Sequence, residues 1–179
     1  MTKAKKFDTR KLVLLALLTA IVVVLQLIGS FIRIGPASVS LVLVPIVVGA
    51  ALISIAAGAW LGFVFGFVVL VTEGLFFMGL NPIGTIITII VRGILAGLSA
   101  GVLYYFISKK SNLFAAIGAA IICPIVNTGI FLLGVAAFFP TFFPVLSPAA
   151  IVNFPLELII NLVLAPTIVR LVQHGQKRG

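Results

Sequence analysis

The chain has 179 residues, of which 63% are hydrophobic and only 8% are charged. This composition excludes a soluble globular domain and indicates an integral membrane protein. The formal net charge of +9 is compatible with nucleic-acid binding, but the basic residues stand in short flanks between apolar runs, a pattern that favours membrane orientation instead. The single cysteine, Cys123, lies inside an apolar run, so the sequence has no disulfide framework and no CxxC site.

The first apolar run covers 12–30 and follows a basic flank, residues 1–11. A signal peptide begins in the same way, but this run has full spanning length and no small-residue cleavage site follows it promptly. We therefore interpret it as a retained first helix. Ala16 and Ala20 are four residues apart and share one face of this helix. Such a pair serves either packing within the protein or docking of another membrane protein, and spacing alone does not separate the two.

A loop with a Gly-Pro pair follows, and we predict a second helix over 39–55 with a kink at Pro45. The third helix is predicted over 57–79. It carries small residues at a spacing of four, which lets a neighbouring helix approach closely. These residues are Gly58, Gly62 and Gly66.

The fourth helix is predicted over 82–108 and opens with Asn81-Pro82. Arg92 stands near its middle, where a cation costs on the order of 2.5–3.5 kcal/mol and needs a partner or a wet cavity. The helix also repeats the glycine spacing of the third helix, so we expect each glycine face to pack closely on a neighbour, with the two faces as a candidate pair. Its glycines are Gly93, Gly97 and Gly101.

The fifth and sixth helices are predicted over 113–139 and 149–172, with a loop rich in proline and phenylalanine between them. Pro124 and Asn127 lie inside the fifth helix. The sixth carries three polar residues at four-residue spacing, which places them on one face. These are Asn153, Glu157 and Asn161.

Basic residues cluster before the first helix, between the fourth and fifth, and after the sixth. With six spans these three places share one side of the membrane, and positively charged loops mark the cytoplasmic side. We therefore predict an all-α integral membrane protein, a single domain over 1–179, with six transmembrane helices and both termini in the cytoplasm. We expect it in the plasma membrane of a bacterium.

Residues for catalysis are nearly absent. The only histidine, His174, stands in the C-terminal tail, and the only aspartate, Asp8, in the N-terminal flank. The chain has no HExxH, GxSxG or P-loop motif and no cluster of metal ligands. We predict that the protein is not an enzyme and needs no cofactor or metal, and that any ATP hydrolysis comes from a partner.

The candidate functional residues are the few polar groups at membrane depth, which are functional candidates by default. In the alternative interpretation, Arg92 pairs with Glu157 or Glu73 only to hold helices together, and the asparagines make interhelical hydrogen bonds. The tyrosines and the tryptophan fall at the inner helix ends and indicate an interfacial belt. The predicted ligand-binding residues are Arg92, Asn127, Glu157, Asn153, Asn161, Asn81 and Glu73.

The whole chain resembles the substrate-binding S components of energy-coupling factor (ECF) vitamin transporters. The resemblance rests on the six-helix pattern, the Ala16-xxx-Ala20 pair in the first helix, and the runs VSLVLVPIVVGAALISIAAGAWLGFVFGFVVLV and NPIGTIITIIVRGILAGLSAGVLYY. These runs look like the subgroup of pantothenate, folate and cobalamin S components. The resemblance implies a transmembrane coupling subunit docked at Ala16 and Ala20, two cytoplasmic ATPases, a vitamin bound near the outer surface, and delivery by toppling in the membrane.

Among vitamins the residues favour pantothenate. It has a carboxylate for Arg92 and an amide and hydroxyls for asparagine and glutamate, and it has no ring that needs a tryptophan or tyrosine. Cobalamin is the alternative, because the phenylalanine-rich outer loops would form a wide apolar mouth, and folate is a weaker one. Two hypotheses of other classes stay open: a membrane scaffold subunit without ligand, and a solitary facilitator that needs no ATPase.

Overall fold

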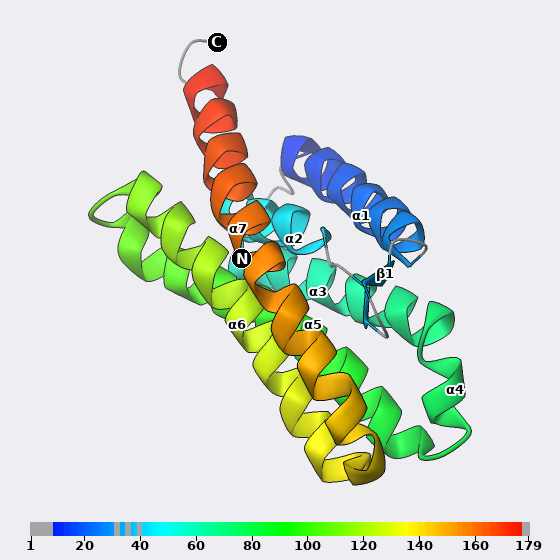
Figure 1. The fold of residues 1–179 in the computed structure, drawn as a ribbon. Coiled ribbons are helices and arrows are strands. Elements are labelled where there is room, and N and C mark those ends of the chain that lie inside the picture. Colours follow the sequence, from blue (N-terminus) through cyan, green and yellow to red (C-terminus); the bar gives the residue numbers. More distant parts are fainter. Residues whose placement is uncertain (1–8, 31–32, 35–36, 39–40, 177–179) are drawn as a thin grey trace, which may run out of the picture.

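The computed structural model describes residues 9–30, 33–34, 37–38 and 41–176; residues 1–8 of the basic N-terminal flank and residues 177–179 lie outside them. The described chain is helical apart from one hairpin of two-residue strands, and the long helices form an elongated bundle (Figure 1). The elements are α1 (Thr9–Gly29), β1 (Arg33–Ile34), β2 (Ala37–Ser38), α2 (Leu43–Leu52), α3 (Ile55–Thr72), α4 (Leu75–Met78), α5 (Pro82–Ser108), α6 (Asn112–Phe138), the 3-10 helix η1 (Pro140–Phe142) and α7 (Phe143–Gln176).

The two glycine stripes predicted on separate helices pack against each other, on α3 and α5. A Cβ added to Gly62 would meet the carbonyl oxygen of Gly93, and one added to Gly97 would meet the carbonyl oxygen of Gly58. The backbones of α3 and α5 are therefore in direct contact, as small-xxx-small seams allow. We call this contact the glycine seam. Gly101 lies beyond the seam and faces Ile55 at the start of α3.

The second predicted helix, 39–55, is wrong in its length, because α2 has only ten residues, Leu43–Leu52. Ser54 ends the run: its side chain accepts a hydrogen bond from the Ala57 amide at 3.1 Å and so caps the start of α3. Pro45 lies in the first turn of α2, where its missing N–H leaves no helical bond unmade, so it produces no kink. Every residue from Leu43 to Ala50 is buried, as expected of a helix that is apolar on all sides.

The third predicted helix also ends earlier than expected. α3 stops at Thr72 with Glu73 as its C-cap, and the short α4 follows after Gly74. At the same end of the bundle, the predicted proline-rich loop is helical and forms η1 and the first turns of α7. Pro140 is at the first position of η1, where proline is favoured.

Four phenylalanines close this end of the bundle. Phe77 of α4 has its ring centroid 5.3 Å from that of Phe139 and 5.6 Å from that of Phe142, and Phe76 lies 6.0 Å from Phe142. The rings meet edge to face, the favoured arrangement of aromatic pairs. α4 is thereby joined to η1 and the end of α6.

Five helices of the described chain are long and apolar enough to cross a membrane: α1, α3, α5, α6 and the last helix with η1. α2 is too short to do so alone, since ten residues extend about 15 Å. The first residues of α1, the α5–α6 turn and the last turns of α7 all lie toward the upper end in Figure 1. We call this the basic end, because it carries Arg10, Lys11, Lys109, Lys110 and Arg170.

Candidate functional site

Polar side chains gather inside the bundle where α5, α6 and α7 meet. Asn127 of α6 and three residues of α7 are buried among apolar neighbours, although α6 and α7 are apolar sequences. Since burial of an unpaired polar group costs several kcal/mol in a membrane, each needs a partner or a ligand. We call the group formed by Arg92, Asn127, Asn153, Glu157 and Asn161 the polar cluster.

Arg92 on α5 is half-buried and lies between two phenylalanine rings. Its guanidinium carbon is 5.5 Å from the ring centroid of Phe65 on α3 and 4.9 Å from that of Phe131 on α6. Such cation–π contacts stabilise a desolvated cation by about 2 kcal/mol. The carboxylates of Glu73 and Glu157 lie within electrostatic range, and its Nε atom has no hydrogen-bond partner among the described residues. The Phe65 and Phe131 rings, which we call the aromatic seat, therefore stabilise the guanidinium without a hydrogen bond from Nε.

Glu73 lies at the end of α3, and its carboxylate is contacted from α1. Gln26, which is buried, donates a hydrogen bond from Nε2 to Glu73 Oε1 at 3.1 Å. Toward the other end of the same pair of helices, the Trp60 indole N–H donates to the Thr19 hydroxyl at 3.3 Å. Glu73 is thus part of the attachment of α1 as well as a neighbour of Arg92.

Asn161 supplies a hydrogen-bond donor that the backbone of α6 lacks. Pro124 lies inside α6 and has no N–H, so it cannot bond the carbonyl of Ala120, four residues earlier. The Asn161 side chain on α7 donates from Nδ2 to that carbonyl at 2.9 Å. Asn161 is nearly fully buried, and its Oδ1 has no partner among the described residues. A structural role is therefore established for one end of this side chain.

Asn127 and Thr88 also bury acceptor atoms. Asn127 Oδ1 and Thr88 Oγ1 have no hydrogen-bond partner in the part of the chain that the structure describes. Thr88 is pressed against α6, because a Cβ on Gly134 would meet its side chain. Asn127 precedes Phe131 on α6 by four residues, about one turn, so the two share a helix face and the open acceptor is on the face whose phenylalanine contacts Arg92.

The remaining predicted residues have other placements. Asn81 is the N-cap of α5, and its Oδ1 accepts a hydrogen bond from the Gly84 amide at 2.9 Å. Ala16 and Ala20 are both exposed on α1, away from the buried face formed by Leu18 and Val22.

Three buried polar residues were not predicted as functional candidates, although the sequence position of each indicates a buried helix face. Gln26 is the one amide in the otherwise apolar second half of α1 and is spaced by four from the buried Val22. Thr85 and Thr88 stand seven and four residues before Arg92, on the same face of α5. Thr85 donates from Oγ1 to the Asn81 carbonyl at 2.8 Å, a bond within its own helix.

The chain matches the family model of the ECF transporter substrate-specific component over residues 10–169. The protein belongs to this family. No curated protein and no solved structure gives a significant match to the chain. As an S component it is a substrate-binding subunit of a membrane transporter, not an enzyme, and it works with an ECF module. The helices that are long and apolar enough to span a membrane agree with this assignment.

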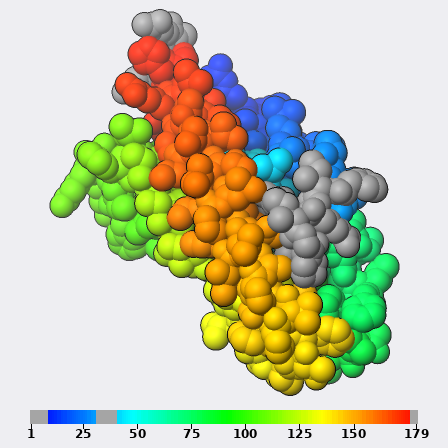
Figure 2. All heavy atoms as spheres, viewed as in Figure 1, coloured from blue at the N-terminus to red at the C-terminus, as the bar shows by residue number. Residues whose placement is uncertain are grey.

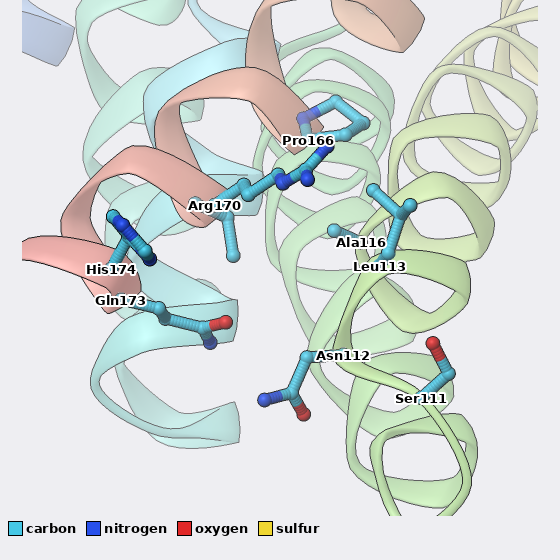
Figure 3. A pocket seen from close by; sticks show the side chains of 9 residues that line it. Ser111, Asn112, Leu113, Ala116, Pro166, Arg170, Gln173 and His174 are labelled. Carbon is cyan, nitrogen blue, oxygen red and sulfur yellow. The ribbon is translucent and has the colours of Figure 1, made fainter. Parts of the chain in front are cut away.

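Two pockets formed by described residues lie outside the polar cluster of this S component. One, of about 210 Å³, is an apolar groove between α6 and α7, lined by Thr128, Gly129 and Phe154 among others. The other, of about 350 Å³, lies between the start of α6 and the end of α7 at the basic end (Figure 3). α7 runs along the front of the molecule in Figure 2, from yellow and orange to red at the basic end.

Proposed function

We propose that this S component binds pantothenate in the polar cluster, captures it outside the cell and delivers it inward together with the ECF coupling module. The observation that carries the proposal is the setting of Arg92. A cation held between two phenylalanine rings, with an unused Nε donor, is suited to a carboxylate that arrives without its water.

The open atoms around Arg92 fit the rest of such a ligand. The acceptor on Asn127 would pair with a ligand hydroxyl or amide N–H, and Asn153 and Glu157 stand opposite on α7. Glu157 would accept from a second hydroxyl, which explains a carboxylate in an anion site. In this proposal Asn161 and Asn81 support the site mainly through the backbone bonds already described.

The aromatic residues support a ligand without a flat ring. The faces of Phe65 and Phe131 are engaged by Arg92, while Trp60 and Tyr105 are exposed and Tyr104 bonds Gln173 at the basic end. The phenylalanines at the opposite end pack on one another, which weighs against the wide mouth that cobalamin would need.

We further propose six membrane crossings, with the β1–β2 hairpin and α2 together forming the second. α2 starts after the hairpin and ends beside α3, and β2 contacts α7. The basic end would then face the cytoplasm of a bacterium, with both termini there. The exposed Ala16 and Ala20 would dock the transmembrane coupling subunit, which carries two cytoplasmic ATPases in the complete transporter.

Titration of the purified full-length protein with pantothenate, after expression in vitamin-depleted medium, tests the proposal. We expect tight binding that falls by roughly 100-fold in Arg92→Gln, since a desolvated charge-assisted contact to a ligand is worth 2–5 kcal/mol. Arg10→Gln, the same change at the exposed start of α1, is the control and should bind like the wild type.

Four outcomes would contradict the proposal in different ways. Binding of cobalamin but not pantothenate keeps the family and rejects the ligand. Wild-type binding by a folded Arg92→Gln variant rejects the site. If no vitamin of a wide panel binds, and if Arg92→Gln does nothing except lower the amount of folded protein, the polar cluster has a purely structural role. Uptake by this chain alone in liposomes would favour a facilitator.

A further inference from the structure

The pocket at the basic end carries chemistry that vitamin binding does not use. It has a volume of about 350 Å³, within the range of small-molecule sites of about 300–1,000 Å³. Its walls are the first turn of α6 and the last turns of α7, and its charged or titratable lining residues are Arg170 and His174. No acidic residue lines it, and both glutamates of the chain lie elsewhere in the fold.

Donor groups converge on this pocket from both helices. Figure 3 shows Arg170 extending from α7 toward Leu113 of α6, with Gln173 and Asn112 below it. Gln173 is fixed in place because its Nε2 donates to the Tyr104 hydroxyl at 2.7 Å, and an amide nitrogen has a second hydrogen to offer. An anion in the pocket would thus meet a guanidinium, an imidazole and two amides.

The start of α6 adds backbone donors. Its N-cap, Ser111, lines the pocket, and the Ser111 side chain does not cap the helix. The first amides of a helix have no partner within the helix, and the positive end of the helix dipole favours anions, phosphate among them. For the 27-residue α6 this effect acts in the same direction as the charge of Arg170.

Part of the pocket wall is apolar. Leu113, which lines it on α6, is 42% exposed, and Ala116, Pro166 and Val169 complete the apolar lining. A soluble phosphate would leave this wall uncovered, whereas the acyl chain of a lipid would cover it. Basic pockets between transmembrane helices on the cytoplasmic side are suited to anionic lipid headgroups.

We propose that this pocket binds the phosphate of an anionic phospholipid of the inner leaflet, through Arg170, His174 and the start of α6, with an acyl chain along Leu113. The lipid would tie the α5–α6 turn to the end of α7 from outside. The proposal is independent of which vitamin the polar cluster takes.

Native mass spectrometry of the full-length protein tests it, with phosphatidylglycerol and phosphatidylcholine of equal chain length. We expect phosphatidylglycerol to bind at least about fivefold tighter, and the double variant Arg170→Gln, His174→Gln to lose that preference, since one basic group near a membrane surface changes affinity about fivefold. Lys11→Gln removes one charge at the same end, outside the pocket, and should bind like the wild type.

Each other outcome overturns the proposal. Equal loss in Lys11→Gln and in the double variant would mean that charge acts without a site. Full displacement of the lipid by excess inorganic phosphate would make the pocket a soluble-phosphate site. Unchanged lipid binding by the double variant, combined with failed assembly with the coupling module, would make it a docking site for an acidic protein segment.

Discussion

At the scale of single residues, the buried amides of this S component do two different things. The Nδ2 group of Asn161 replaces the N–H that Pro124 lacks, whereas the Oδ1 atom of Asn127 has no partner among the described residues. In a membrane the first arrangement is needed for the helix itself, because a carbonyl without a donor is costly there. The second is the kind of open group that a ligand completes.

The repair of α6 by Asn161 predicts a coupling between two distant positions. Asn161→Leu should lower the free energy of unfolding by about 1–3 kcal/mol, because the Ala120 carbonyl loses its donor. Pro124→Ala restores a backbone N–H to α6, so Asn161→Leu should cost less in that background, with a coupling energy on the order of 1 kcal/mol. Unfolding titrations in detergent of the four proteins measure this cycle.

The control for this cycle is Thr167→Val. Thr167 is exposed on α7 and bonds the Val163 carbonyl of its own helix, so its effect should add to that of Pro124→Ala. An additive result for Asn161 as well would show that the side chain does not act through the carbonyl left by the proline.

The sequence indicated which polar residues lie at membrane depth, but not which of them bond the backbone and which have open atoms. Arg92, Asn127 and the α7 residues were visible because polar groups are rare in such apolar helices. Asn161 bonds a carbonyl 41 residues away, and nothing in the order of residues indicates that these positions meet. The seat of Arg92 between rings of α3 and α6 depends on tertiary packing in the same way.

At the scale of helices, the glycine seam sets how closely α3 and α5 approach. Gly62 faces Gly93, and Gly58 faces Gly97, backbone to backbone. The close approach also brings Phe65 of α3 within reach of Arg92 on α5, so the seam helps to build the aromatic seat.

Gly97→Ala should therefore destabilise the protein. Its new methyl would meet the backbone carbonyl of Gly58, which cannot rotate away, and overpacking of this kind costs about 1–3 kcal/mol. Gly129→Ala on α6 is the matched control, since a Cβ there meets nothing within 4 Å. Thermal unfolding in detergent should show a melting temperature several degrees lower for Gly97→Ala alone; equal melting temperatures would argue against a tight seam.

The sequence predicts which segments are helical. It predicts a helix end only where a clear capping residue marks that end. Asn81-Pro82 marks the start of α5. The end of α2 was missed because 39–55 is apolar almost throughout and Ser54 is the one capping residue near its end. The proline-rich segment after α6 was misread as a loop because Pro140 and Pro144 fall in first turns, where helices accept proline, and because Pro148 lies inside α7.

At the scale of the whole molecule, α1 lies at the edge of the bundle (Figure 1). Its buried residues form a single stripe flanked by half-buried leucines that pack on the core, and most of its other side chains, Ala16 and Ala20 among them, are exposed. Two polar contacts hold it to α3, from Gln26 to Glu73 and from Trp60 to Thr19. Its exposed alanine face is thus available to a partner without disturbing the polar cluster.

In the proposed docking, Ala16→Phe should abolish transport by the complete transporter while the proposed pantothenate binding by the purified S component stays unchanged, because the bulky ring would block close approach of the coupling subunit. Ile21→Phe is the control: Ile21 is exposed but stands roughly 100–140° around α1 from the two alanines. Uptake in liposomes and binding in detergent are measured for each variant. Retained transport by Ala16→Phe would reject this face as the docking site.

The bond from Asn161 to Ala120 also bears on how the protein is made. α6 leaves the ribosome first, and the donor for its unpaired carbonyl is synthesised 41 residues later, on α7. Until then α6 would enter lipid with one backbone group unsatisfied, which is unfavourable. We therefore expect α6 to be retained at the insertion machinery until α7 is complete, so that the two helices enter the bilayer as a pair.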